Sequence, residues 1–402
     1  MGAESPCVAI VGAGLGGLCL AQGLAERGIR FAVFERDAAA DSRTQGYRIR
    51  IDHHGQKALA SCLPAAAYRQ FLRTCALPAD GVNLLGTGLE DMSDRWVQAW
   101  RRGPSDAVDV DRSAHRKTMR EVLMAGIEPH IHFGKSFSHY HEQDSHIIVH
   151  FEDGTTFEAG VLVGADGVHS AVRHQRMPAH APVDTGTVCI YGKTYPGDIA
   201  SADALGPLLG RTSAVFAKGM AVIVDDMRFE QGAFDALDGS SGLTPVDDYV
   251  YWAVIGTREA FDMPPAAAIP SQQDVLKSLV VHTARSWARP LRTLFSASAT
   301  ASVTMAPVRR AASMPTWTPG RVTLLGDAIH AMSPAGGLGA NTALRDASVL
   351  ASYLSRALGD RSMVSVGVAD YEASMRAYGA QALEASENSA QALLGLADPL
   401  PT

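Results

Sequence analysis

Largely apolar runs recur at three places along the chain, and each ends at a turn that contains glycine or aspartate. The runs are 7–11 (CVAIV), 161–163 (VLV) and 322–325 (VTLL). Apolar runs of this length are typical of parallel strands buried on both faces, because neither side of such a strand meets water. We therefore expect an α/β fold whose turns lie at the carboxyl ends of strands, where open parallel sheets bind ligands.

The first run opens a strand–helix–strand unit. It leads directly into the motif GAGLGG (12–17), a helical pattern follows, and the next strand ends in Glu35. In such a unit Gly12 permits a tight turn, Gly14 lets the backbone approach a pyrophosphate, and Gly17 lets the helix pack closely on the strand. Glu35 lies 35 − 17 = 18 residues after Gly17, where a carboxylate can accept hydrogen bonds from a ribose. We expect a dinucleotide site here, with Arg36 beside it.

The second run brings an aspartate to the end of a strand. A β-meander is predicted over 133–157, with Asp153-Gly154 as a hairpin turn. The meander leads through the apolar run into Asp166-Gly167, and a helix begins near a serine. A second strand end of this kind, far away in the sequence, is hard to explain by packing alone.

The third run continues into Gly326-Asp327, a loop with Pro334, and a helix that extends to about residue 358. Glycines allow this loop to lie flat against a planar ring and to direct its amides at the ring. The helix start adds partial positive charge, which favours a ring that becomes anionic on reduction, such as a flavin. A loop that only connects a strand to a helix is the simpler alternative. The loop residues expected at the cofactor are Gly337, Leu338, Gly339, Ala340 and Asn341.

Two further segments bear on the ligand. Residues 45–51 alternate with period two, which predicts a strand with Arg48 and Arg50 on one face; Arg48 is either solvated, salt-bridged or in contact with a phosphate. Between about 177 and 299, short strand-like runs separated by Gly, Pro and Asp loops predict an inserted antiparallel sheet. Aromatic and sulfur-bearing side chains on this sheet are either ordinary core or substrate contacts. The candidates are Tyr191, Phe216, Met220, Tyr251 and Trp252.

Composition excludes several classes of protein. The net charge of −7, with both signs interspersed, gives no reason to expect nucleic acid or an anionic membrane as a partner. Five cysteines without a CxxC pair indicate neither a disulfide framework nor a zinc site, and no histidine or carboxylate cluster at metal-ligand spacing is evident, so no metal is expected. With no leader-like or membrane-spanning run, we expect a cytoplasmic protein.

The three motifs, in this order, resemble those of the group A flavoprotein monooxygenases, the p-hydroxybenzoate hydroxylase-like family. The resemblance extends over roughly residues 7–360. It implies that Asp166-Gly167, with Ser170 and Arg173, contacts both FAD and the pyridine nucleotide. It also implies that Asp327 binds the ribityl chain, that Arg112 lies beside FAD, and that His330 and Pro334 belong to the third motif.

The resemblance also implies an architecture: an α/β protein with a Rossmann-like FAD-binding domain, an inserted antiparallel β-sheet substrate domain and a C-terminal helix. We expect the FAD-binding domain to comprise 1–78, 105–178 and 300–360, and the substrate domain to comprise 79–104 and 179–299. The C-terminal helical segment is expected over 361–402.

The function implied is hydroxylation of an aromatic or polycyclic small molecule, in secondary metabolism, by O₂ and either NADPH or NADH through a flavin C4a-hydroperoxide. Only one GxGxxG motif is present, so the nicotinamide is expected to dock transiently. Pro334, Gly337 and Arg48 are the expected catalytic residues, with Pro334 and Gly337 beside the reduced flavin ring. His330 is expected to have a structural hydrogen-bonding role rather than to act as a base. A monomer or a homodimer is equally compatible with the sequence.

Other functions remain open at this point. The same fold can perform alkene epoxidation or Baeyer–Villiger oxidation, because the same oxygenated flavin serves all three reactions. An FAD dehydrogenase without oxygenation would keep the flavin but lose oxygen uptake coupled to product. A flavin-binding partner protein that senses redox state would oxidise NADPH slowly under every condition.

Overall fold

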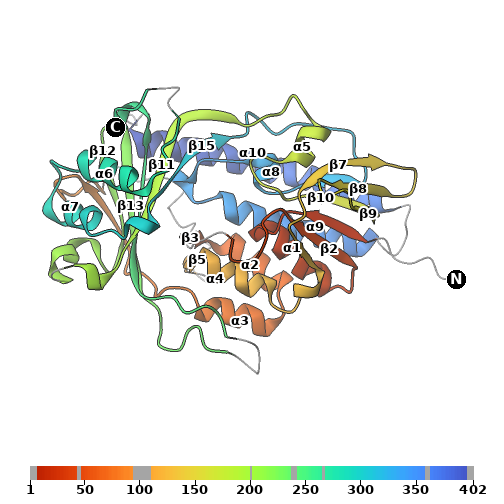
Figure 1. Ribbon diagram of the computed structural model, residues 1–402, viewed down its shortest axis with the longest axis horizontal. Coiled ribbons are helices and arrows are strands. Elements are labelled where there is room, and N and C mark those ends of the chain that lie inside the picture. Colours follow the sequence, from red (N-terminus) through yellow and green to blue (C-terminus); the bar gives the residue numbers. More distant parts are fainter. Residues whose placement is uncertain are drawn as a thin grey trace.

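A computed structural model of the chain describes residues 7–42, 47–93, 110–199, 202–236, 242–264, 268–357 and 363–395. Two large sheets lie towards opposite ends of the molecule, with helices around the first sheet and the long helix α10 extending between them (Figure 1). The inserted sheet domain and the C-terminal helix are both present.

The first sheet is parallel and has the strand order β16-β10-β1-β2-β6. The strand β1 lies at its centre, and both of its faces are buried, as the apolar run 7–11 predicted. Val11 pairs with Gly164 of β10, and Gly164 pairs with Leu324 of β16, so three adjacent strands end level with one another. The strands are β1 (Val8–Val11), β2 (Phe31–Glu35), β6 (Ile131–Phe133), β10 (Val161–Gly164) and β16 (Val322–Leu324).

The predicted meander divides between two sheets. Residues 131–133 form β6 at the edge of the parallel sheet, and the hairpin strands form a separate sheet with the order β7-β8-β9. These strands are β7 (Phe137–Glu142), β8 (Ile147–Phe151) and β9 (Thr156–Ala159). A two-stranded sheet pairs β3 (Arg48–Ile51) with β5 (Arg112–His115).

The second large sheet has six strands in the order β15-β11-β14-β13-β12-β4. Its neighbouring strands are antiparallel except for β12 and β4, which run parallel. Of the segment 79–104 assigned to the substrate domain, residues 82–86 form β4; residues 94–109 lie outside the described residues. The strands are β4 (Val82–Gly86), β11 (Val183–Thr194), β12 (Thr212–Ala217), β13 (Met220–Met227), β14 (Tyr249–Thr257) and β15 (Thr304–Arg310).

Two features delimit the helices that flank β3 and β5. Residues 53–73 form two helices, α2 and α3, because Pro64 cannot continue the first one. Helix α4 begins only at Arg116, since residues 112–115 form β5. Within the described ranges, every helix is too short or too polar to serve as a membrane span. The α-helices are α1 (Leu15–Ala25), α2 (His53–Cys62), α3 (Ala65–Arg73), α4 (Arg116–Met124), α5 (Ala171–Arg176), α6 (Gln273–Thr283), α7 (Arg289–Ser296), α8 (Asp327–His330), α9 (Gly339–Ala357) and α10 (Val364–Leu394).

The six-stranded sheet separates the predicted substrate residues onto two faces. Tyr191, Phe216 and Tyr251 belong to the face that packs towards the cofactor-binding domain. Met220 and Trp252 belong to the opposite face, where they pack in a core formed with α6 and α7, and the indole of Trp252 stands edge-on to Phe295 of α7. Side chains alternate along a strand, so neighbouring residues cannot line one wall. The expectation that all five residues share a cavity wall is wrong for Met220 and Trp252.

A buried ion pair joins the two domains. The Nε atom of Arg48 in β3 donates to Asp225 Oδ2 in β13 at 2.7 Å, and Ser113 Oγ of β5 donates to the same oxygen at 2.5 Å. Thr212 Oγ1 donates to the other carboxylate oxygen at 3.0 Å. Of the alternatives that the sequence left open for Arg48, the structure shows the salt bridge. Both side chains are largely buried, with 14% and 4% of their surfaces exposed, so solvent screens the pair weakly.

We predict that Asp225→Asn lowers the free energy of unfolding by roughly 3–5 kcal/mol, because it leaves a buried guanidinium without its counter-charge. Asp226→Asn is the matched control. Its carboxylate pairs with Arg228, whose side chain is 52% exposed, and loss of such a pair costs about 0–1 kcal/mol. Urea unfolding of both variants measures the difference, and equal losses would contradict the importance of the buried pair.

Candidate functional site

Three loops meet where β1, β10 and β16 end. Gly12 N donates to Phe34 O at 2.8 Å, Ala165 N donates to Val11 O at 2.8 Å, and Leu325 N donates to Gly164 O at 3.0 Å. The parallel pairing thus continues to the first residue of each loop. The glycine motif, the Asp166-Gly167 loop and the Gly326-Asp327 loop, separated by more than 300 residues of sequence, form one continuous edge.

The three motif glycines have different physical roles. Gly12 has a φ of +109°, and a Cβ there would lie 2.4 Å from Ala165 O of the neighbouring loop. A Cβ on Gly17 would lie 2.1 Å from Gly12 O. Gly14 has an ordinary φ of −76°, and a Cβ there would meet no atom within 4 Å. Two glycines are therefore required by the fold, whereas Gly14 faces open space at the start of α1, where a phosphate group can approach the helix amides.

A cavity opens beside this helix start. Its lining includes Gly14, Glu35, Arg116 and Arg120. Glu35 accepts hydrogen bonds from Ala13 N at 2.8 Å and from Asp37 N at 3.0 Å, so the protein itself fixes the carboxylate at the end of β2. The full lining places both acidic and basic side chains around a backbone turn, where a ribose and a pyrophosphate would bind.

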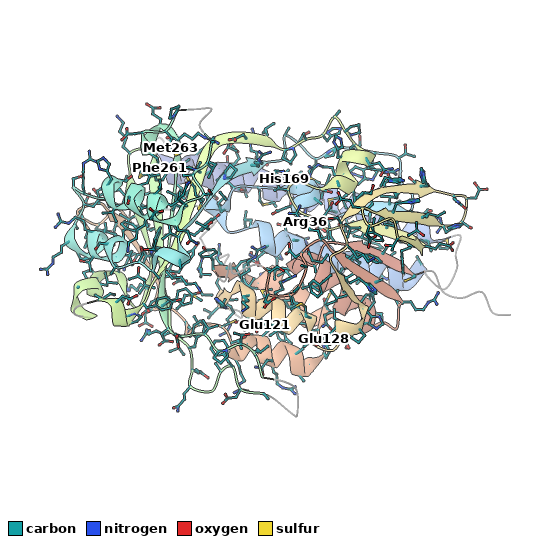
Figure 2. The ribbon with its side chains drawn as sticks, viewed as in Figure 1. Arg36, Glu121, Glu128, His169, Phe261 and Met263 are labelled. Carbon is teal, nitrogen blue, oxygen red and sulfur yellow. The ribbon has the colours of Figure 1, made fainter. Side chains whose placement is uncertain are left out.

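Arg36 is exposed and lies on the open side of this region, near His169 (Figure 2). Desolvation lowers the pKa of His169, and the positive charges of Arg309, Arg36 and Arg173 lower it further. The positive charges of Arg36, Arg173 and Arg309 make this rim attractive to anionic groups.

The Asp166 loop is held mainly through a helix cap. Oδ2 of Asp166 accepts from Ala171 N at 2.7 Å, at the start of α5, and Ser170 Oγ accepts from Arg173 N at 2.9 Å. The other carboxylate oxygen of Asp166 is buried without a hydrogen-bond partner in the described part of the chain. The buried Arg173 donates to Val168 O and to Ala328 O, both at 2.9 Å, and so ties the second loop to the third. Arg173 therefore positions both motifs.

Asp327 begins the short helix α8, directly after Gly326, which has a φ of +60°. Its side chain reaches solvent, yet desolvation by the surrounding protein raises the pKa of Asp327, while His330 and Arg116 lower it. Arg116 is a residue that sequence reasoning missed: it starts α4 and lines the cavity. Arg112, which the sequence suggested for this place, lies on β5 opposite Ile51, and its charge acts on Cys75. No local signal identifies Arg116, because α4 starts there only when β5 pairs with β3.

The loop from Pro334 to Asn341 presents backbone amides to the same edge. Pro334 is exposed, Gly337 has a φ of +64°, and α9 begins at Gly339. Gly337 N donates to Pro334 O at 3.0 Å, and the first backbone hydrogen bond of α9 runs from Thr342 N to Leu338 O at 2.9 Å. The amides of residues 339–341 lie in the first turn, where a helix has no carbonyl partners for them.

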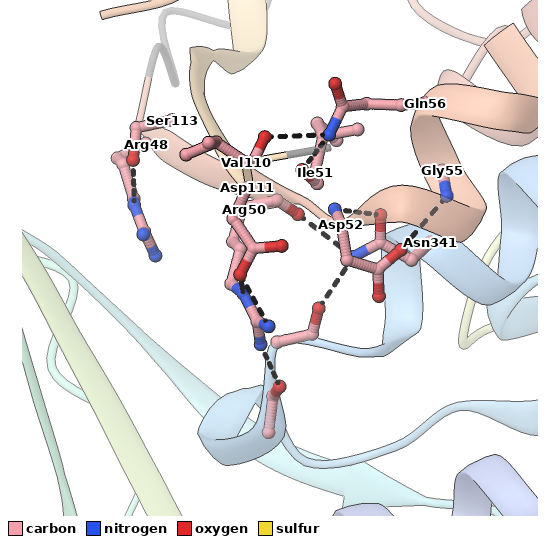
Figure 3. A network of polar contacts seen from close by, with 12 residues as sticks. Arg48, Arg50, Ile51, Asp52, Gly55, Gln56, Val110, Asp111, Ser113 and Asn341 are labelled. Carbon is pink, nitrogen blue, oxygen red and sulfur yellow. Dashed lines mark hydrogen bonds and ion pairs between the residues drawn. The ribbon is translucent and has the colours of Figure 1, made fainter. Parts of the chain in front are cut away.

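The side chain of Asn341 holds this loop in place (Figure 3). Its amide nitrogen donates to Gly337 O at 2.9 Å and to Arg50 O at 3.0 Å, and its oxygen accepts from Asp52 N at 3.0 Å. All three bonds are internal to the protein, so Asn341 orients the loop against β3. Only its backbone amide is left to face a ligand.

His330 lies beneath the loop rather than in the cavity. Its Nε2 and Asp346 Oδ2 are 2.6 Å apart, and neither side chain is exposed. Burial acts to lower the pKa of His330, but the adjacent Asp346 carboxylate raises it above its ordinary value. The same carboxylate accepts from Gly326 N and from Tyr378 OH, each at 2.7 Å. The expectation of a structural role for His330 agrees with this geometry.

Taken together, these residues fit an FAD molecule. Glu35 and the open turn at Gly14 suit the ribose and pyrophosphate, Arg116 and Arg120 supply positive charge, and Asp327 supplies an acceptor near the first turn of α9. Loop amides in the first turn of α9 suit an isoalloxazine ring.

The structure also corrects the expectation that the histidines form no cluster. Within the described residues, ligand nitrogens of His139, His141 and His150 all lie within 4.8 Å of one another. The cluster is on the β7–β8 hairpin, outside the cavity.

Two protein families and several known proteins match parts of this chain. Residues 10–60 match the NAD(P)-binding Rossmann-like domain family, and residues 273–386 match the FAD binding domain family. The chain is 36% identical over 386 residues to the dual O-methyltransferase/FAD-dependent monooxygenase elcB of Phaeosphaeria nodorum, covering 85% of this chain and 39% of that protein. It is 28% identical to the 6-methylsalicylate 1-monooxygenase atA of Aspergillus terreus, covering 87% of this chain and 74% of that one.

The chain thus spans less than half the length of the first curated relatives it matches. Among solved structures, a protein of Photorhabdus luminescens subsp. laumondii TTO1 that is described as an FAD-containing monooxygenase superposes on this chain with a TM-score of 0.80. The two chains are 28% identical in sequence. That alignment covers 98% of this chain and 100% of the other.

We predict that Gly14→Val leaves the fold intact but weakens FAD binding by about tenfold or more, which corresponds to ~1.4 kcal/mol or more. The valine side chain would enter the space that the pyrophosphate needs, and nothing in the protein obstructs it. Flavin fluorescence titration of the apoprotein measures affinity, and circular dichroism measures folding. Gly17→Ala is the contrasting variant, because its Cβ would collide with Gly12 O and lower stability instead. Unchanged flavin affinity in Gly14→Val would exclude this turn as the pyrophosphate site.

We also expect Asp327→Ala to weaken FAD binding, by roughly 1.5–3 kcal/mol, because hydrogen bonds to a charged acceptor are lost. The readout is the flavin content of the purified variant, together with its dissociation constant. A variant that keeps full flavin occupancy and wild-type affinity would show that Asp327 does not hold the cofactor.

Proposed function

The chain belongs to the group A FAD-dependent monooxygenases, and we propose that it uses NAD(P)H and O₂ to hydroxylate an aromatic or polycyclic small molecule of secondary metabolism. The observation that carries this proposal is the meeting of three loops at adjacent strand ends, opposite the inner face of a large β-sheet. A site built in this way offers a cofactor edge on one side and a separate wall for a planar substrate on the other.

FAD, when bound, supplies the redox chemistry and the activation of O₂. The protein's part is to bind and orient the ring, to exclude water and to place the substrate. We assign Pro334 and Gly337 to the ring, because the loop that contains them is fixed by Asn341 and leaves backbone amides at its end. Arg48 is held through Nε, so its terminal nitrogens remain available to a ligand within the described part of the chain.

The inner face of the six-stranded sheet supplies the substrate wall in this proposal. Tyr191 and Lys193 are two residues apart on β11 and therefore lie on the same face of the sheet. Lys193 pairs directly with Tyr251 of β14, which lies on that face as well. Tyr47, which precedes β3, packs against Tyr191 with ring centroids 5.4 Å apart. Phe216 lies on the same face in β12. Aromatic side chains from both domains thus meet on this face, where we place the planar substrate.

Lys193 gives this wall a specific chemistry. Its Nζ lies 3.3 Å from His115 Nε2 and 4.3 Å above the ring of Tyr249. Among the described residues no carboxylate forms an ion pair with it, and desolvation, with a smaller contribution from Lys117, lowers the pKa of Lys193 to about 8. A half-buried ammonium without a counter-ion favours an anionic group on the substrate, such as a carboxylate or a phenolate. The relative from Aspergillus terreus, named for 6-methylsalicylate, acts on an aromatic acid of this kind.

The decisive experiment is to follow NADPH and NADH oxidation and oxygen uptake by the flavin-loaded protein with a panel of aromatic acids, phenols and quinones. Each mixture is then analysed by mass spectrometry. The proposal predicts that an effective compound stimulates both rates and yields a product heavier by one oxygen atom. Stimulated oxidation without such a product would favour an oxidase or dehydrogenase, and a flavin that neither nucleotide reduces would favour a redox-sensing protein.

We predict that 6-methylsalicylate, used as an anionic probe, binds more weakly as the pH rises through about 8. The carboxylate of the probe stays ionised throughout, whereas Lys193 loses its positive charge over this range. Lys193→Met should weaken binding and remove the pH dependence. Perturbation of the flavin absorption spectrum measures the dissociation constant.

Lys117→Met serves as the matched control for this prediction, because Lys117 lies near Lys193 but pairs with Glu121 on the surface of α4. It should change the affinity little. If Lys193→Met kept the wild-type pH dependence of binding, Lys193 would not be the anion-binding group. The monooxygenase proposal would be unaffected by that result, because it depends on detecting a product heavier by one oxygen atom.

A further inference from the structure

Three histidines lie together on the outer face of the β7–β8 hairpin, away from the cofactor edge. The rings of His139 and His150 are parallel, with centroids 4.3 Å apart and an interplanar angle of 6°. His141 stands edge-on to both, at 4.9 Å from His139 and 5.1 Å from His150. One nitrogen from each ring lies within 4.8 Å of the other two.

A β-bulge creates this arrangement. Phe137 pairs with Phe151, yet the next pair is His139 with His150, so β7 contains one extra residue at Ser138. Phe137 and Tyr140 are both buried, three positions apart, which regular alternation does not permit. The bulge therefore turns His139 outward, onto the face that carries His141. Bulges commonly redirect a side chain in this way.

The chemical state of the cluster suits a metal ligand. Nε2 of His150 is buried and has no hydrogen-bond partner in the described part of the chain. A ring nitrogen without a hydrogen-bond partner can coordinate a metal ion when the imidazole is neutral. Ser138 Oγ lies 3.1 Å from His139 Nδ1, a contact that can fix the orientation of that ring.

We propose that His139, His141 and His150 bind one divalent transition-metal ion of the class that prefers imidazole, with Zn²⁺ as the representative ion. Three imidazoles satisfy most of the coordination of such an ion and leave an open position for water. Hard cations such as Mg²⁺ prefer oxygen ligands and would not bind here. The site does not depend on the monooxygenase assignment, since none of its residues touches the cavity.

A bound ion would join β7 to β8 next to the helix that follows the Asp166 loop. Tyr140 N donates to Gln175 Oε1 at 2.9 Å, and Gln175 Nε2 donates to Tyr140 O at 2.8 Å, so β7 already holds α5 through both of these groups. Arg176 Nη1 adds a bond to Glu142 at 3.0 Å. The metal would stiffen the strand that supports α5.

The test is equilibrium dialysis of the flavin-loaded protein, free of any affinity tag, against ZnCl₂ at pH ~7.5, followed by metal analysis. The proposal predicts one Zn²⁺ per chain in the wild type and a higher melting temperature with zinc than without it. His150→Ala and His141→Ala should each weaken binding at least about tenfold, the least that loss of an outer-shell partner usually costs. With Cu²⁺, electron paramagnetic resonance should show hyperfine splitting from coordinated nitrogens in the wild type only.

His146→Ala is the matched control, because His146 belongs to the same hairpin but not to the cluster. It should bind zinc like the wild type, and MgCl₂ should neither bind nor raise the melting temperature. Circular dichroism and flavin content verify that each variant is folded. Zinc affinity that is equal in the wild type, His141→Ala and His150→Ala would overturn the proposal, as would the absence of zinc binding to the wild type.

Discussion

The alignment of three neighbouring strand ends is the constraint on which the rest of the structure depends. Val11, Gly164 and Leu324 pair in register, so the loops that follow them must lie against one another. The fit is tight, since Gly12 has room for no side chain beneath Ala165 O. A ligand that touches all three loops thus contacts residues that follow Val11, Gly164 and Leu324, which are far apart in the sequence.

The loops are supported by buried polar groups rather than by the ligand alone. Asp346 accepts hydrogen bonds from Gly326 N and Tyr378 OH and contacts His330, which joins the third loop to α9 and α10. Arg173 fastens the second loop to the third. Because these groups are buried and bonded to one another inside the protein, the cofactor edge is formed in advance, and binding need not order it. Preorganisation of this kind reduces the cost of binding and fixes the position of the reactive ring.

Sequence patterns predicted the elements whose signal is local. The apolar runs, the motif glycines, Asp166 and Asp327 were placed correctly at strand ends, because a buried strand and its turn are encoded in consecutive residues. Features set by distant pairing were missed. Strand β5 delays the start of α4 and brings Arg116 to the cavity, since it forms only by pairing with β3. The faces of Met220 and Trp252, and the bulge that groups three histidines, likewise follow from register, which spacing alone does not determine.

The most direct test of the account is a crystal structure of the chain with FAD bound. The account predicts one FAD per chain, with the ribose by Glu35, the pyrophosphate at the turn of Gly14, the ribityl chain at Asp327 and the isoalloxazine against the backbone at Gly337. Such a structure would unite the three strand-end loops in a single site. A flavin bound elsewhere, or one that contacts only the first loop, would contradict it.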